Sequence, residues 1–192
     1  MIDYTPLVQH TSLFYKSEEE YLDVVIPYLK AGLEGNEFCA WILPETLKVK
    51  DARAHLSRSV ENLDAYFIKK QISITDYRSF YLKDDVFSAS GIIETIIEVE
   101  KIALERGFKG IRGTGDASWA LGAYWFRFLI YEKQLNGIIS GHKIKALCTY
   151  LIEKLEIRSI YNIGINHQAS LVKQNGSWNR LDPSGFAKAN IC

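Results

Sequence analysis

The stretch that decides the fold is Phe38-Cys39-Ala40-Trp41-Ile42-Leu43, an apolar run that ends at Pro44. A strand with water on one face alternates apolar and polar residues, so an uninterrupted apolar run predicts a strand buried on both faces. A similar run, KALCTY, covers residues 145–150. Strands of this kind occur in parallel sheets that carry helices on both sides. The sequence therefore predicts a parallel sheet at the centre of the protein.

Outward from this strand, strand-like and helix-like segments alternate along the chain. One helix begins at Ser17 with Glu20 three residues later, a capping box, and Pro27 inside it predicts a kink. Strands are predicted at 12–15, 38–43, 72–77, 108–114, 145–150 and 169–173, and helices at 17–35, 49–56, 60–67, 88–107, 118–136 and up to 161, with mostly loop over 174–192. This order predicts one α/β domain over residues 1–192, with its core at about 10–175 and a mostly parallel central sheet between two helix layers.

Charge and composition exclude several classes of protein. The 192 residues hold 23 Lys and Arg against 23 Asp and Glu, and 47% are apolar. The apolar share excludes intrinsic disorder, and the lack of a basic excess argues against direct nucleic acid binding. No apolar run approaches the roughly 20 residues that span a bilayer, and residues 1–15 show no secretory signal. With three unpatterned cysteines, we expect a cytoplasmic protein without membrane contact.

The most informative polar segment is RGTGDASW, residues 112–119, directly after a predicted strand. Ligands of open parallel sheets bind beyond the carboxyl ends of the strands. Gly113 and Gly115 allow a tight turn and close approach of a ligand, and Asp116 or Ser118 can cap the next helix. An equally good interpretation is a turn without a ligand. A dinucleotide fingerprint fits poorly because Ser118 replaces its third glycine, and the sequence contains no GxxxxGK[ST] phosphate loop.

Glu132 lies on the otherwise apolar stripe of the helix predicted at 118–136. A buried carboxylate needs a partner, and Arg112 and His167 are candidates; alternatively Glu132 lies half-exposed at the edge of the stripe. The histidines and cysteines lack metal-ligand spacing, and Cys39 and Cys148 are interpreted as small core residues. With no nucleophile motif either, we expect no metal, no cofactor and no catalytic residue.

Six short segments carry a family resemblance: HTSLFY (10–15), GNEFCAW (35–41), RGTGDASWA (112–120), YEKQLN (131–136), ALCTY (146–150) and His167. In this order they resemble the MEDS family, the methanogen/methylotroph, DcmR sensory domain. The resemblance implies a RecA/KaiC-like sandwich without a P-loop that acts as a ligand-sensing input domain. It also implies responses to small hydrocarbon derivatives, including one-carbon and halogenated compounds, and association with DNA-binding, kinase or other signalling modules.

The resulting hypothesis is a non-catalytic small-molecule sensor with its pocket at the carboxyl ends of the strands. Expected apolar walls are Phe14, Tyr15, Trp41, Trp119 and Tyr150, expected polar contacts are His10, Arg112, Asp116, Glu132 and His167, and Gly113, Gly115 and Ser118 complete the site as its loop. Expected partners are a small apolar or one-carbon ligand and a signalling protein, either a kinase or a transcription regulator, with a homodimer left open. Two alternatives are a degenerate RecA/KaiC-like nucleotide-binding domain and a protein-interaction module.

Overall fold

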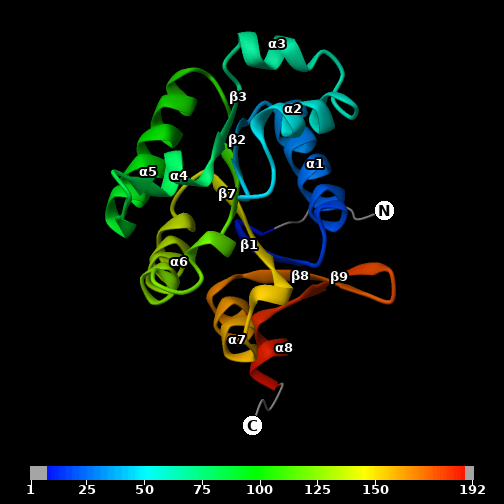
Figure 1. The fold of residues 1–192 in the computed structure, drawn as a ribbon. Helices are drawn as coiled ribbons and strands as arrows, with labels where there is room; N and C mark the ends of the chain where they lie inside the picture. Colours follow the sequence, from blue (N-terminus) through cyan, green and yellow to red (C-terminus); the bar gives the residue numbers. More distant parts are fainter. Residues whose placement is uncertain (1–7, 189–192) are drawn as a thin grey trace.

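The computed structural model describes residues 8–188, and its centre is a seven-stranded sheet with the order β3-β2-β6-β7-β1-β8-β9 (Figure 1). Every neighbouring pair is parallel except β8 and β9, which are antiparallel at one edge. The strands are β1 (His10–Tyr15), β2 (Phe38–Leu43), β3 (Ile72–Asp76), β6 (Ile111–Asp116), β7 (Ile144–Leu151), β8 (Ala169–Gln174) and β9 (Ser177–Leu181), and a small ribbon pairs β4 (Leu82–Lys83) with β5 (Val86–Phe87).

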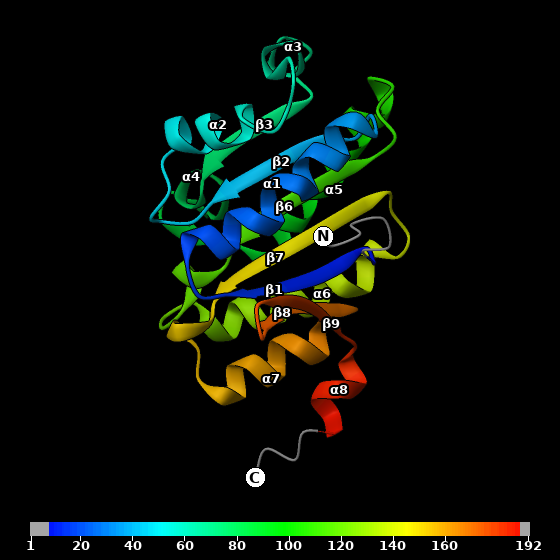
Figure 2. The same ribbon diagram turned by 90° about the vertical axis from the view of Figure 1, so that its right-hand side faces the viewer.

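Helices cover both faces of the sheet. Figure 2 shows α1 and α2 in front of the strands, with α5 and α6 behind them. The helices are α1 (Glu18–Glu34), α2 (Val49–Ser57), α3 (Leu63–Ile68), α4 (Tyr77–Tyr81), α5 (Ala89–Glu105), α6 (Trp125–Ile139), α7 (Ile157–Asn166) and α8 (Pro183–Lys188), with short 3-10 turns η1 (Ser118–Ala120) and η2 (Ile152–Lys154). We call the two sides the α1 face and the α5 face. The predicted α/β sandwich with a mostly parallel sheet is confirmed.

The apolar run FCAWIL, residues 38–43, is buried on both sides, as predicted. Cys39, Trp41 and Leu43 pack into the core of the α1 face, whereas Ala40 and Ile42 pack into that of the α5 face. The alternation follows from the pleat of a strand, in which successive side chains point to opposite faces. Both helix layers therefore bury one half of the same strand.

The first helix begins as its sequence predicts. The Ser17 hydroxyl accepts a hydrogen bond from the Glu20 amide, and Glu20 Oε2 accepts one from the Lys16 amide. The first bond is the N-cap bond of the predicted capping box, and in the second the Glu20 side chain reaches back to the amide one residue before the N-cap. The helix runs as one element through Pro27 to Glu34. None of the helices within residues 8–188 has the length and apolar character needed to cross a membrane.

Two predicted segments, 108–114 and 118–136, have other boundaries in the structure. β6 covers Ile111–Asp116 rather than 108–114, so Gly113 and Gly115 are paired strand residues, and the predicted glycine loop at this place is wrong. The helix predicted at 118–136 is divided into η1 and α6, because Gly122 adopts a φ of 95° that a helix does not allow. Both differences arise at glycines, because the sequence shows neither the strand pairing of Gly113 and Gly115 nor the φ angle of Gly122.

The segment predicted to be loop, 174–192, contains regular structure within its described part. Asn175 and Gly176 have φ angles of 51° and 78°, which is the left-handed pair of a two-residue hairpin turn. This turn joins β8 to β9, and α8 follows. An Asn-Gly pair is a strong sequence signal for a hairpin, so the sequence does contain the information that predicts this turn.

Candidate functional site

An apolar cavity of about 240 Å³ lies on the α5 face, between the sheet and the helices that cover it. Most of its strand residues are small or apolar, among them Ala40, Gly113, Ala146 and Cys148. Its helical residues come from three elements and include Phe80 and Tyr81 of α4, Ile96 and Val99 of α5, and Tyr131 and Leu135 of α6. The cavity thus opens over the middle of β2, β6 and β7 rather than beyond their ends.

Two glycines of β6 contribute to this cavity in different ways. A Cβ added at Gly113 would have only the Ala40 carbonyl oxygen near it, at 4.0 Å, so Gly113 leaves open space. A Cβ added at Gly115 would instead overlap the Tyr81 hydroxyl, so Gly115 allows that ring to lie against the strand. Tyr81 in turn stacks on Trp119 with a centroid distance of 5.1 Å. Trp119 is therefore linked to the cavity through Tyr81.

A fully buried polar cluster adjoins the cavity at Cys148. Its members are His10 of β1, Glu132 of α6, Cys148 of β7 and His167, which ends α7. Glu132 Oε2 lies 3.1 Å from His10 Nε2 and 3.2 Å from His167 Nε2, and Cys148 Sγ lies 3.5 Å from His10 Nε2. One donor atom from each of the four side chains lies within 4.8 Å of the others. Sequence spacing could not predict this, because the four residues come from separate elements.

Burial and mutual contact set the charges in this cluster. Burial by itself would raise the pKa of Glu132, but the two imidazoles outweigh it and hold that pKa well below its usual value. Burial raises the pKa of the Cys148 thiol, and the neighbouring Glu132 raises it further. Burial lowers the pKa of His167, with His10 adding to the effect. Glu132 is therefore an ionised carboxylate beside a protonated thiol at neutral pH.

Tyr150 lies beside the polar cluster, and Phe14 lies opposite Tyr150 on the paired strands β1 and β7. Their ring centroids are 5.9 Å apart, and the ring of Tyr150 meets that of His167 edge-on at 6.0 Å. The buried Tyr150 hydroxyl has no hydrogen-bond partner among the described residues. Tyr150 therefore borders the cluster and Phe14 packs against Tyr150, and neither lines the pocket at the strand ends.

A second, polar pocket of about 320 Å³ lies at the carboxyl ends of the strands and contains Tyr15, Asp116, Ser118 and Trp119. Asp116 accepts hydrogen bonds from the Tyr15 hydroxyl (2.8 Å), the Ser118 amide (2.9 Å) and the Thr149 hydroxyl (3.2 Å). Burial nevertheless raises the pKa of Asp116, because these bonds offset only part of the desolvation. Four of the expected site residues meet here, at the edge of the sheet where the sequence placed them.

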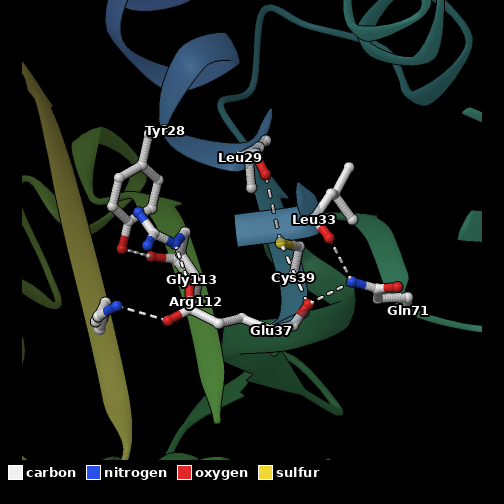
Figure 3. A network of polar contacts seen from close by, with 9 residues as sticks. Tyr28, Leu29, Leu33, Glu37, Cys39, Gln71, Arg112 and Gly113 are labelled. Atoms are coloured by element: carbon white, nitrogen blue, oxygen red, sulfur yellow. Dashed lines mark hydrogen bonds and ion pairs between the residues drawn. The ribbon is translucent and has the colours of Figure 1, made fainter. Parts of the chain in front are cut away.

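Arg112 lies on the α1 face, and the structure does not bring it together with the cavity or the cluster; Trp41 borders the cavity from β2, although it packs in the core of the α1 face. Arg112 Nε donates to Glu37 Oε2 at 2.5 Å, and its guanidinium lies over the ring of Tyr28, 4.8 Å from the centroid (Figure 3). Trp41 is completely buried, and its Nε1 donates to the Tyr21 hydroxyl at 2.7 Å. Alternation along β2 and β6 is the physical reason, since neighbouring residues face opposite layers.

Comparison with known proteins gives the family. The family model described as MEDS, the MEthanogen/methylotroph, DcmR Sensory domain, matches residues 9–168. This chain belongs to the MEDS family. The matched range contains the whole polar cluster and all the strands around the cavity. Membership in this sensory family indicates a sensory or signalling role for the chain. A search of curated proteins found no match.

The MEDS fold resembles that of two solved structures from Pyrococcus horikoshii. The KaiC-like protein PH0186 has a TM-score of 0.57 and 15% identity, and the alignment covers 90% of this chain and 76% of that one. The uncharacterized protein PH0321, in complex with an unknown peptide, has a TM-score of 0.60 and 14% identity, with 90% and 82% covered. At these sequence identities the structural similarity shows the fold alone. The fold is KaiC-like, as the resemblance to the MEDS family implies.

Proposed function

We propose that this MEDS domain is a non-catalytic sensor that binds a small hydrocarbon derivative in the apolar cavity of the α5 face. The proposal depends on the cavity itself, which has a volume of about 240 Å³ and is lined mainly by small and apolar side chains. Pockets for drug-sized ligands start at roughly 300 Å³, so this volume favours a guest of only a few heavy atoms. The hydrophobic effect supplies the binding energy, since the apolar surfaces of both the ligand and the cavity are removed from water.

Support for a non-catalytic role comes from the chemistry of the cavity wall. The candidate nucleophile there is the Cys148 thiol, whose pKa is raised by burial and by Glu132. The thiolate is the reactive form of cysteine, so a thiol kept protonated is a poor nucleophile. Glu132 lies next to this thiol but is engaged by two histidines. The arrangement favours recognition over bond breaking.

The elements around the cavity suggest how occupancy is transmitted. Binding stabilises whichever arrangement of α4, α5 and α6 encloses the guest, and so shifts the population of that arrangement. A signalling partner, a kinase or a transcription regulator, would recognise the shifted surface. The exposed side chains of Phe126 and Ile130 on α6 lie on the helix that would move.

The nucleotide-binding alternative has less support. The pocket at the strand ends includes the start of α1, where Ser17 and Glu18 lie. A helix N-terminus attracts phosphate through its free amides and dipole. Here the first turn carries Glu18, Glu19 and Glu20, whose negative charges repel a phosphate. The Ser17 and Glu20 side chains also occupy two of the amides near this terminus.

Isothermal titration tests the proposal. The purified chain is titrated with methanol, methylamine, a halomethane and short alcohols, and separately with ATP and Mg²⁺. We expect at least one organic compound to bind with a negative heat-capacity change, the signature of apolar burial. Absence of binding across the panel would contradict the proposal, and a saturable response to ATP with Mg²⁺ would favour the nucleotide alternative.

A further inference from the structure

The buried polar cluster offers a set of four donors that prefer a transition-metal ion. Two imidazole nitrogens, one thiol sulfur and one carboxylate face each other, and all four residues are buried. Nitrogen and sulfur donors with a carboxylate are the ligands that zinc and related divalent ions take in proteins. We propose that His10, Glu132, Cys148 and His167 form a binding site for one divalent transition-metal ion of the zinc type.

The first support is the orientation of the two histidines. His167 Nδ1 donates to the Ile163 carbonyl oxygen at 2.8 Å, because a carbonyl can only accept. His10 Nδ1 lies 3.2 Å from Asn136 Oδ1, which also accepts. Both Nδ1 atoms are thereby held by partners outside the cluster, and both Nε2 atoms face Glu132. Metal-binding histidines are oriented in this way, with the second ring nitrogen donating to a carbonyl or side-chain oxygen.

The second support is the spacing of the donor atoms. Zn–N bonds of about 2.0–2.1 Å and Zn–S bonds of about 2.3 Å in a tetrahedron place neighbouring ligand atoms roughly 3.3–3.8 Å apart. Glu132 Oε2 lies 3.1 Å and 3.2 Å from the two Nε2 atoms, and Cys148 Sγ lies 3.5 Å from His10 Nε2. Small rotations of these side chains are therefore enough to surround one ion.

The third support is polar atoms that protein contacts leave unsatisfied. Neither Glu132 Oε1 nor His167 Nε2 makes a hydrogen bond within the described part of the chain, although both are buried. His167 Nε2 lies 3.2 Å from Glu132 Oε2, but without hydrogen-bond geometry. A buried acceptor without a partner is costly, and a cation placed between these atoms satisfies them together.

The site adjoins the apolar cavity without depending on it. Cys148 borders both, and Tyr131 and Leu135 of the cavity wall flank Glu132 on α6. A metal ion here would hold the sheet and α6 together at the wall of the cavity. Metal binding can therefore be tested without knowing any organic ligand, and it can succeed or fail independently of the sensor proposal.

Cobalt spectroscopy tests the site directly. The reduced, chelator-treated chain is titrated with Co²⁺, and absorption is followed in the near ultraviolet and visible. We expect one ion per chain, a thiolate-to-cobalt charge-transfer band and the visible bands of tetrahedral cobalt, followed by displacement with Zn²⁺. Because an ion that binds only the folded state stabilises it, the melting temperature should also rise with zinc concentration. A wild-type chain that shows none of these changes at micromolar metal would overturn the proposal.

The chain supplies matched controls among its three cysteines, Cys39, Cys148 and Cys192. Cys148→Ser should abolish the charge-transfer band, whereas Cys39→Ser, at a cysteine that is also buried but lies on the α1 face, should keep it. Cys192, which lies outside the described residues, is tested by Cys192→Ser. Loss of the band in either control variant, or its persistence in Cys148→Ser, would place the metal elsewhere and overturn the proposal.

A positioning residue gives a second test if Cys148→Ser does not fold. Asn136→Ala removes the partner of His10 Nδ1 and no proposed ligand. We expect it to weaken zinc affinity about 10- to 100-fold while retaining the thiolate band, as loss of an outer-sphere contact does. Gly113→Val, which alters only the cavity, should retain wild-type metal affinity. Unchanged affinity in Asn136→Ala would contradict the proposed orientation of His10.

Discussion

The imidazole rings of His10 and His167 stack with their centroids 4.0 Å apart. The two residues lie at the starts of neighbouring strands, where the Gln168 amide donates to the His10 carbonyl at 2.9 Å. Glu132 contacts both rings from α6. The carboxylate therefore joins a helix to the sheet through two histidines at once, and its removal should affect the whole layer.

Glu132→Ala should lower the free energy of unfolding by about 3–5 kcal/mol, because it leaves polar groups buried without their partner. Urea denaturation of metal-free protein measures the change. Glu98→Ala is the control, since Glu98 is 59% exposed and pairs with Lys101 at 3.7 Å. We expect the control to lose less than about 1 kcal/mol. Equal losses in the two variants would show that the buried contacts contribute nothing beyond an ordinary surface pair.

The same substitution at two glycines of β6 should have opposite effects on stability. Gly113→Val places methyl groups in the open space of the cavity, so stability should be kept or increased while binding of the organic ligand is lost. Gly115→Val collides with Tyr81 and should cost about 1–3 kcal/mol through overpacking. Thermal denaturation and calorimetric titration of both variants provide the comparison. Normal ligand binding by the Gly113→Val variant would show that the cavity is not the binding site.

Arg112→Ala should destabilise the protein without changing ligand affinity. Glu37, 9% exposed, receives Arg112 Nε on one oxygen and Lys145 Nζ on the other, so loss of Arg112 leaves a buried carboxylate partly unpaired. We expect a loss of about 3 kcal/mol, at the lower end for a broken buried pair. Arg53→Ala, at an exposed pair with Asp64, serves as the control and should cost less than about 1 kcal/mol. A change in ligand affinity with Arg112→Ala would contradict its assignment to the α1 face.

The raised pKa of Asp116 predicts a pH dependence of stability. Between its unfolded value of 3.8 and the higher folded value, the folded state holds a proton that the unfolded state has released. The slope of stability against pH is then negative, so stability contributed by protonated Asp116 is lost as pH rises through the folded pKa. Asp116→Asn removes this loss. Urea denaturation across acidic to neutral pH should show wild type falling relative to the variant, and a pH-independent difference would contradict the shift.

The sequence predicted the layers of the fold better than the site. Continuous apolar strands such as FCAWIL and the capping box at Ser17 are local signals, and both predicted structures are confirmed. The extent of β6 was missed because glycine weakens strand propensity, and only pairing with β2 and β7 makes Gly113 and Gly115 strand residues. The local sequence pattern therefore predicts an element well when burial of its apolar side chains determines it, and less well when pairing with distant strands does.

The candidate site was predicted in parts. Glu132 and His167 were expected to be partners, and the structure places them in contact; Arg112, the other candidate, points to the opposite face. Cys148 was interpreted as a small core residue because it lies inside a strand of the buried type, yet it borders both the cluster and the cavity. Convergence of residues from β1, α6, β7 and the end of α7 depends on strand order, which a single sequence does not specify.

The stacked histidines also bear on how the chain is made. β1 emerges from the ribosome first, but its neighbours in the sheet are β7 and β8, the latter of which follows His167. Contacts between such distant segments close large loops and form late in folding. During synthesis the contacts of His10 with the rest of the cluster can form only after the chain has been translated through His167. A polypeptide that stops before His167 therefore lacks the completed cluster.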